Sequence, residues 1–117
     1  MIAALLLLAQ AAPAATVTPE QADARCIAVF AAMASSDKEE MQRAAQLGGL
    51  YFYGKLLGRN PGLDLQATMT AAATAVKGDI RPELTRCGGE LERSGRAMQA
   101  AGQAMGSGTA PAAPPKK

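Results

Sequence analysis

Two cysteines are the first residues in this sequence with a capacity for chemistry. Cys26 and Cys87 stand 61 positions apart, which is too far for the C-x-x-C pair of a dithiol redox site. In a chain exported to an oxidising compartment, two such cysteines are typical of one structural disulfide. A bridge that closes so long a loop contributes about 4 kcal/mol in the chain-entropy account. We therefore expect Cys26 and Cys87 to be joined.

A cationic and aromatic segment, residues 51–59, is the most unusual local feature. It contains three of the four aromatic residues of the chain, together with Lys55 and Arg59. On a helix, Lys55 lies near the face that carries Tyr51, and Arg59 lies one turn further along. Tyr51, Lys55 and Arg59 are therefore the candidate residues for binding a ligand or a partner. The alternative is that both cations extend along apolar surface and offset the negative end of the helix.

Paired carboxylates offer another possible chemistry, because two carboxylates in different environments can divide acid and base roles. Glu39 and Glu40 crowd a predicted helix start, where the helix dipole favours acidic residues. Glu90 and Glu92 are flanked by arginines, and Glu92 precedes Arg96 by the four residues that suit a helical salt bridge. We interpret both pairs as surface ion pairs.

Histidine is absent from the sequence, which removes the usual general base, the Ser-His-Asp and Cys-His arrangements, and the commonest zinc and haem ligands. No phosphate-binding loop of the G-x-x-x-x-G-K-S/T or G-x-G-x-x-G type occurs. The formal net charge of +2 and the aromatic content of 3% argue against nucleic acid as a partner. We predict no catalytic residue, no metal site, no cofactor, and a protein that is not an enzyme.

The elements that must position these residues are all helical in pattern. Thr18-Pro19-Glu20-Gln21 has the residues of a capping box and starts a predicted helix that runs to about Ala34. A second box at Ser36-Asp37-Lys38-Glu39 starts a helix that ends around Gly58 and Asn60-Pro61-Gly62. Cys26 lies on the apolar face of the first of these helices, whereas the cationic and aromatic segment belongs to the second.

Two further helices are predicted in the second half of the chain. Asp64 caps a third helix, which runs to Lys77-Gly78, and Asp79-Ile80-Arg81-Pro82 opens a fourth and longest helix, which runs to about Met105. The third helix could also continue into the fourth. No alternating strand pattern occurs. The sequence therefore predicts an all-α fold, a small bundle of about four helices with one disulfide between the first and last helices.

Three glycines recur every seven residues along the predicted fourth helix, at Gly88, Gly95 and Gly102. Each is unfavourable by about 1 kcal/mol relative to alanine in a helix interior. We expect another backbone to approach closely along this flank, either as a neighbouring helix packed on small residues or as a ligand or partner in a groove.

The two ends of the chain differ from the helical part. Residues 2–9 form an uninterrupted apolar run that is too short to span a membrane, and Ala12-Pro13-Ala14 is an A-x-A cleavage pattern. We predict a signal peptide at residues 1–14, cleaved near Ala14, and a periplasmic or secreted protein with no stable membrane span afterwards. Residues 15–105 are the predicted helical domain, and the Pro- and Ala-rich residues 106–117 are a predicted disordered tail.

The arrangement of these features resembles a known family. An exported helical chain with Cys26 in its first helix, the aromatic segment Tyr51-Phe52-Tyr53-Gly54, and Cys87 near the start of its last helix is similar to the periplasmic acid-stress chaperones of the HdeA type. The chain differs from that family in a longer interval between the cysteines and in its lack of tryptophan. The pattern is also similar to that of short exported proteins of alphaproteobacteria, a likeness that implies no function.

The resemblance implies a chaperone that acid switches on, with unfolded client proteins as its partners. Protonation of all 10 carboxylates would take the formal net charge from +2 to +12, and self-repulsion would then loosen the helices. The alternative is a periplasmic binding or structural module, in which Lys55 and Arg59 recognise a small anionic ligand or an envelope protein. The sequence leaves the oligomeric state open.

Overall fold

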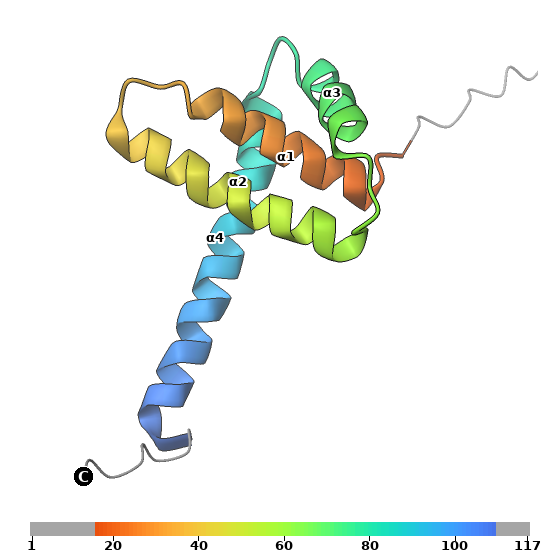
Figure 1. Ribbon diagram of the computed structural model, residues 1–117. Helices are drawn as coiled ribbons and strands as arrows, with labels where there is room; N and C mark the ends of the chain where they lie inside the picture. Colours follow the sequence, from red (N-terminus) through yellow and green to blue (C-terminus); the bar gives the residue numbers. More distant parts are fainter. Residues whose placement is uncertain (1–15, 110–117) are drawn as a thin grey trace, which may run out of the picture.

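A computed structural model describes residues 16–109, which form four α-helices and no strand (Figure 1). The helices are α1 (Pro19–Met33), α2 (Glu39–Arg59), α3 (Leu65–Ala75) and α4 (Arg81–Ala104), and a π-helical turn, η1 (Met105–Thr109), follows α4. The predicted all-α fold is confirmed. The predicted signal peptide and residues 110–117 of the predicted tail lie outside the described residues, and residues 106–109 belong to η1.

Two of the predicted helix starts are confirmed atom by atom. The Thr18 hydroxyl oxygen accepts a hydrogen bond from the Gln21 backbone N–H at 3.2 Å, and the Gln21 side chain accepts one from the Thr18 N–H at 3.0 Å. This exchange satisfies two backbone donors that the first turn of α1 leaves unpaired. At α3, the Asp64 carboxylate accepts from the Ala67 N–H at 3.0 Å.

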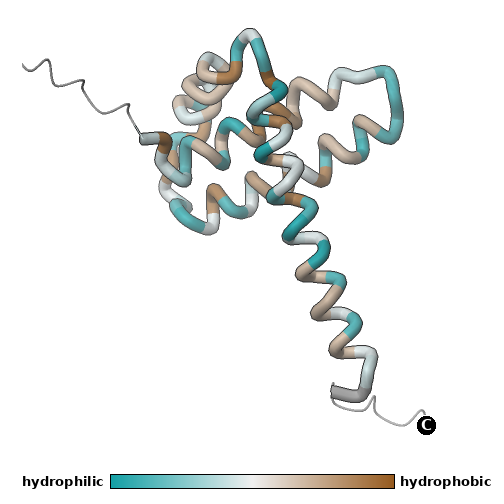
Figure 2. The backbone as a smooth tube through the Cα atoms, turned by 180° about the vertical axis from the view of Figure 1, so that it is seen from behind, coloured by the Kyte–Doolittle hydropathy of each residue, from teal (hydrophilic) through white to brown (hydrophobic). Residues whose placement is uncertain are grey.

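The second predicted capping box is wrong. Lys38 is the residue before α2, and its side chain makes no capping hydrogen bond. The Ser36 hydroxyl accepts instead from the Lys38 N–H at 3.2 Å, within the turn that joins α1 to α2. Because α2 begins only at Glu39, the Ser36 hydroxyl bonds within the turn and does not cap the helix. Figure 2 shows that hydrophilic residues gather at this turn.

The third and fourth predicted helices are separate. Gly78 lies between them with a φ of +108°, a conformation that glycine adopts without the penalty of a side chain. The Asp79 side chain then accepts from the Arg81 N–H at 3.1 Å, at the first residue of α4. The chain therefore turns at Gly78 and begins a new helix.

The core is built around α1, which contacts the other three helices. One group of buried side chains joins α1 to α2 and α3 through Val29, Leu56 and Ala72. A second group joins α1, α2 and α4 through Phe30, Phe52 and the two cysteines. Figure 1 shows α1 between α2 and α3, with α4 crossing behind it.

A disulfide joins Cys26 of α1 to Cys87 of α4, as the sequence predicts. The two sulfur atoms are 2.08 Å apart, the two Cα atoms are 5.5 Å apart, and both residues are fully buried. The bond therefore ties the central helix to the last helix inside the second group of core residues.

Only the first half of α4 packs against the other helices. Every residue from Gly95 to Ser107 is exposed, and this distal half of α4 extends away from α1, α2 and α3 (Figure 1). No other helix of the chain packs closely at Gly88, Gly95 or Gly102, because a Cβ at any of these positions would meet no described atom within 4 Å. The predicted packing of a neighbouring helix there is therefore wrong, and the alternative of a ligand or partner stays a prediction. The close approach of two helices occurs instead at Gly48 of α2, where a Cβ would lie 2.6 Å from the ring of Phe30 on α1.

Candidate functional site

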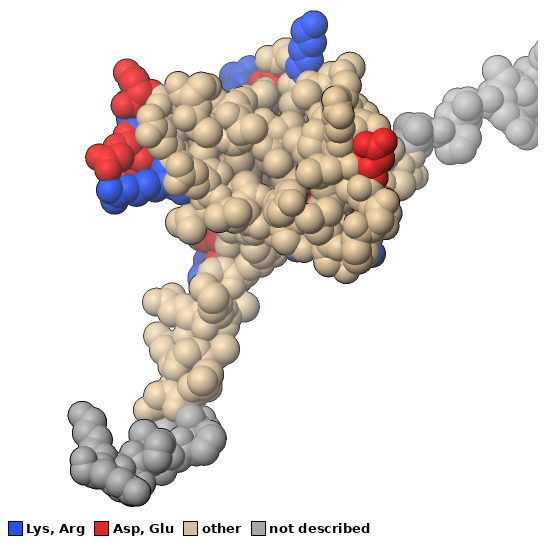
Figure 3. All heavy atoms as spheres, viewed as in Figure 1, with Lys and Arg blue, Asp and Glu red and all other residues tan. Residues whose placement is uncertain are grey.

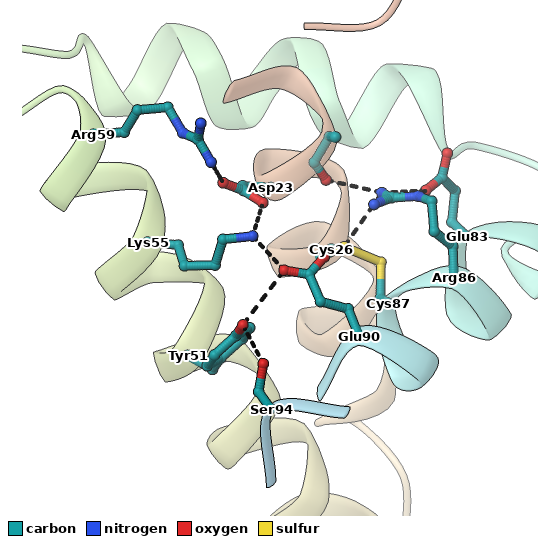
Figure 4. Close-up of polar contacts among 11 residues, drawn as sticks. Asp23, Cys26, Tyr51, Lys55, Arg59, Glu83, Arg86, Cys87, Glu90 and Ser94 are labelled. Carbon is teal, nitrogen blue, oxygen red and sulfur yellow. Dashed lines mark hydrogen bonds and ion pairs between the residues drawn. A yellow bond between two sulfur atoms is a disulfide. The ribbon is translucent and has the colours of Figure 1, made fainter. Parts of the chain in front are cut away.

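Three helices supply charged side chains to one cluster. Asp23 lies on α1 one turn before Cys26, and it is buried, with 3% of its surface exposed. Lys55 and Arg59 lie four residues apart on α2, so that both project from one face of that helix. Glu90 lies on α4, three residues after Cys87, which holds this part of α4 against α1. The packing of α1, α2 and α4 therefore brings these four residues together (Figure 4).

Lys55 is the residue that connects the three helices. Its ammonium group donates a hydrogen bond to Asp23 Oδ1 at 3.1 Å and another to Glu90 Oε1. Arg59 Nη2 donates to the other Asp23 oxygen, Oδ2, at 3.3 Å. Both oxygens of the buried Asp23 carboxylate are thus paired with cations of α2, which offsets the desolvation of its charge. We call Asp23, Lys55, Arg59 and Glu90 the ion-pair network.

The hydroxyl groups of Tyr51 and Ser94 are hydrogen-bonded next to this network. The Tyr51 hydroxyl lies 2.6 Å from the Ser94 hydroxyl and donates to Glu90 Oε1 at 3.4 Å. The Lys55 ammonium nitrogen also lies 5.8 Å from the centre of the Tyr51 ring and 5.4 Å from that of Phe52. Contacts of this kind between a cation and an aromatic ring are attractive. The positive charge of Lys55 is therefore stabilised by carboxylates and by rings.

The pKa of Lys55 is raised above its ordinary value of 10.5. Desolvation by burial acts to lower the pKa, but the hydrogen bonds to Glu90 and Asp23 and the charges of both carboxylates outweigh it. Lys55 therefore carries a full positive charge at neutral pH, and it does not have the properties of a general base.

A second polar cluster covers the disulfide. Arg86 of α4 donates to the Ala22 carbonyl oxygen at 3.0 Å and lies 3.3 Å from Cys26 Sγ. Arg86 also pairs with Glu83 on its own helix, and Glu83 lies 3.6 Å from Arg25 of α1. These contacts join α1 to α4 on the face beside Cys26, and the sequence analysis did not identify them.

The predicted site residues Tyr51, Lys55 and Arg59 do lie together. Tyr51 and Lys55 both bond to Glu90, and Lys55 and Arg59 both bond to Asp23. An anionic ligand would therefore have to displace a carboxylate of the chain from these cations. Recognition of such a ligand stays a prediction.

Asp23 is the residue of this site that the sequence analysis missed. One signal could have identified it, because Asp23 lies three residues before Cys26 and seven before Phe30, within the apolar face of the predicted helix. Glu90 was interpreted as a surface partner of arginine, and this is wrong, since its partner is Lys55. The pair of Glu92 with Arg96, at 3.4 Å, is confirmed as a surface pair.

The described residues offer no other centre for chemistry. No group of three or more histidine, cysteine, aspartate or glutamate side chains within residues 16–109 could hold a metal ion. None of the described helices combines the length and apolar character that a membrane crossing requires. The hollow between α1 and α3 is lined mostly by small and polar side chains, and of its two charged residues, Glu20 and Arg25, the arginine pairs with Glu83.

The fold and the network define a class, a small all-α protein in which one disulfide and one ion-pair network join three helices. No protein-family model, no curated protein and no solved structure matches the chain. The chemistry of the network is therefore the guide to its function.

Proposed function

We propose that the chain is an exported chaperone that acid activates, and that its helices loosen as the protein loses negative charge in acid. One observation carries this proposal: Lys55 of α2 is held between carboxylates of two other helices. The position of α2 against both α1 and α4 therefore depends in part on negative charge that acid removes.

Protonation would change the balance of charge inside the network. At neutral pH, Asp23 and Glu90 face Lys55 and Arg59, two negative charges against two positive charges. In acid the carboxylates become neutral, whereas the lysine and the arginine keep their charges and repel each other. A partly exposed ion pair contributes only about 0–1 kcal/mol, so the network alone would not unfold the protein. It would act together with a formal net charge that rises to +12 when all 10 carboxylates are protonated.

The start of α4 adds a further acid-sensitive contact. The pKa of Asp79 is lowered, first by the hydrogen bond from the Arg81 side chain and second by that from the Arg81 backbone N–H. A carboxylate with a lowered pKa in the folded state contributes stability above its ordinary value of 3.8, and this contribution is lost as the pH falls through the folded-state value. Acid therefore weakens the turn that begins α4.

The disulfide determines which helix can move. Because Cys26 and Cys87 are bonded, α1 and α4 stay together in acid, and α2 is the helix that can separate from them. The buried face of α2 consists of Ala45, Gly48, Phe52 and Leu56. Separation would expose this face and the Phe30 ring that packs on it. Such apolar surface could bind unfolded clients while the covalent link preserves a route back to the native state.

The compartment is part of the same proposal. Disulfides persist in the periplasm and outside the cell, whereas cytosolic thiols are kept reduced. Intact mass of the protein recovered from a periplasmic extract, before and after reduction, would test both export and oxidation. We expect a chain that begins after Ala14 and gains mass on reduction, and two free thiols or an uncleaved leader would contradict this part of the proposal.

The chaperone proposal is tested by following structure and client binding from pH 7 to pH 2. We expect far-UV circular dichroism to persist in acid, near-UV signal to be lost, a hydrophobic dye to bind, and an acid-unfolded client enzyme to stay in solution. A rigid chain that binds neither dye nor client at pH 2 to 3 would rule the proposal out.

A pair of variants tests the role of the network in this transition. Asp23→Asn/Glu90→Gln imitates the protonated carboxylates, and we expect it to move the transition to higher pH. Glu39→Gln/Glu92→Gln makes the same change in net charge at side chains that are 77% and 67% exposed, and it serves as the control. If both variants shift the transition equally, the total charge controls it and the network does not. Binding of a small anion at pH 7 that Lys55→Ala/Arg59→Ala abolishes, with no acid transition, would favour the binding-module alternative.

A further inference from the structure

The distal half of α4 exposes an apolar face that continues an interface already present in the fold. Along α4 and into the first residue of η1, the large residues Leu84, Leu91, Met98 and Met105 recur every seven positions, with Cys87, Ser94 and Ala101 between them. Leu84, Cys87 and Leu91 pack against α1 and α2. The same line then leaves the other helices, and Met98 and Met105 are 76% and 65% exposed. The pattern is the 3–4 repeat of helices that pack along their length.

Charge is absent from the end of α4 after Arg96. Arg96 is the last charged residue before the end of η1, so that residues 97–109 carry none. The visible face of this part of the molecule in Figure 3 shows no blue or red atoms. Isolated helices of about this length are marginal in water, and a surface helix normally has charged residues on its outer side. A second helix packed on this segment would account for its composition.

The face is complementary to itself when two copies are antiparallel. In one register, Met98 of each copy lies opposite Ala101 of the other, and Met105 lies opposite Ser94. Every layer then pairs one long side chain with one short side chain, which gives an even spacing between the helices. A parallel pair would stack Met98 on Met98 and Ala101 on Ala101, with alternately wide and narrow layers.

The flanks of the face also suit a second copy. Gly95 and Gly102 lie beside the methionines, and a Cβ at either position would meet no described atom within 4 Å. Glycines there let a second helix come close. Arg93 and Arg96 project from the opposite side of α4, so that they do not meet their counterparts in this arrangement. The contact would have two-fold symmetry and would close with two copies.

We propose that residues 94–105, the end of α4 and the first residue of η1, form an antiparallel contact with the same segment of a second copy of the chain. The dimer is a feature of the neutral, folded protein and is independent of the acid response. Because only about three helical turns of each copy take part, the association is weak, with a Kd on the order of 10 to 100 μM.

Sedimentation velocity of the purified protein at pH 7, over a range of concentrations, tests this contact. We expect a monomer–dimer equilibrium that Met98→Glu weakens by about tenfold or more, since the dimer would bury an unpaired carboxylate. Gln103→Glu adds the same charge on the opposite side of the exposed helix and should leave the equilibrium unchanged. Near-UV circular dichroism should match the wild type in both variants, because neither residue is buried in the monomer.

A second pair of variants tests the orientation. In the antiparallel register, position 95 of one copy lies beside position 102 of the other, whereas the two positions are two turns apart within one chain. Gly95→Glu/Gly102→Lys should therefore dimerise about tenfold more strongly than Gly95→Glu/Gly102→Glu, because opposite charges meet across the contact in the first variant and like charges meet in the second. Equal dimerisation of the two variants would overturn the antiparallel arrangement.

Three results would overturn the proposal as a whole. The first is a wild-type protein that remains monomeric at about 1 mM. The second is a dimer that Met98→Glu does not weaken, which would assign the contact to another surface. The third is a monomer that binds phosphatidylcholine vesicles in a manner that depends on Met98, which would identify a lipid surface as the occupant of the face.

Discussion

At the scale of single residues, the pairing of Asp23 with Lys55 carries most of the functional argument. Asp23 is buried on the central helix, and a buried carboxylate without a partner is strongly unfavourable. Lys55 and Arg59 provide partners from α2, and Glu90 gives Lys55 a second carboxylate from α4. A change at Lys55 therefore affects the charge balance of three helices at once.

The raised pKa of Lys55 makes a prediction for alkaline pH. Because the pKa is higher in the folded state than its ordinary value of 10.5, the ammonium contributes stability that is fully present below that value and is lost as the pH rises through the folded-state pKa. We expect Lys55→Gln to be less stable than the wild type in urea denaturation by an amount that is constant from about pH 6 to pH 9. The difference should narrow above about pH 10.5. If the difference in stability between Lys55→Gln and the wild type stays the same throughout the alkaline range, the raised pKa of Lys55 is contradicted.

Gly48 is the glycine at which the fold requires the absence of a side chain. A Cβ there would lie 2.6 Å from the Phe30 ring, which is itself packed in the core. We expect Gly48→Ala to lower the free energy of unfolding by about 1–3 kcal/mol, because the ring must move. Gly49→Ala is the control, since a Cβ there meets no described atom within 4 Å. It should raise the free energy of unfolding by roughly 0.5–1 kcal/mol through helix propensity. Equal thermal stability of the two variants would show that α1 and α2 pack less closely at this point.

At the scale of elements, α1 is the helix on which the others assemble, and α4 is the helix most dependent on the disulfide. α1 buries Ala24, Cys26, Val29 and Phe30 against its neighbours, whereas Cys87 is the one buried residue of α4. With so little buried surface of its own, α4 is held to the rest by the Cys26–Cys87 bond, by Arg86 and by Glu90.

Removal of the disulfide should therefore release α4 before the other helices. We expect Cys26→Ala/Cys87→Ala to lower the free energy of unfolding by about 4 kcal/mol, from the entropy of the opened loop. Hydrogen exchange measured by mass spectrometry should show faster exchange in α4 than in α1 and α2 of the variant. Uniform loss of protection over all four helices would mean that the fold unfolds as one unit without the bond.

At the scale of the whole molecule, positive and negative charges are nearly equal in number at neutral pH, whereas positive charges dominate in acid. The 12 basic and 10 acidic residues give a formal net charge of +2. Acid leaves the basic residues charged and neutralises the acidic ones. Repulsion between exposed charges is screened by salt over a distance of about 10 Å at 0.1 M ionic strength. The acid transition of the whole chain should therefore respond to salt.

We expect about 0.5 M sodium chloride to move the loss of near-UV circular dichroism to lower pH, because screening weakens the repulsion that drives it. The Asp23→Asn/Glu90→Gln variant should show the same direction of shift from its own higher midpoint. If the pH midpoint of this transition does not depend on salt, repulsion across the whole molecule does not drive it, and the individual ion pairs alone account for it.

Much of the fold was predictable because it rests on contacts between residues close in the sequence. The capping box at Thr18 and the cap at Asp64 involve residues three positions apart, and apolar residues at helical spacing indicate each helix without knowledge of its neighbours. The disulfide was also predictable, since two cysteines offer one intramolecular pairing. The placement of Tyr51, Lys55 and Arg59 on one side of α2 follows from the same helical spacing.

The sequence by itself determined the four helices and three of their starting points, because these depend on hydrogen bonds between neighbouring residues. It also determined the disulfide, because a chain with two cysteines has one possible intramolecular pair. Only the tertiary structure decided that Lys55 bonds to Asp23, 32 positions away, and that the close approach of helices falls at Gly48. It also decided that α4 leaves the other helices after Ser94. These features depend on the angles at which helices cross and on which faces meet, and no local pattern specifies them.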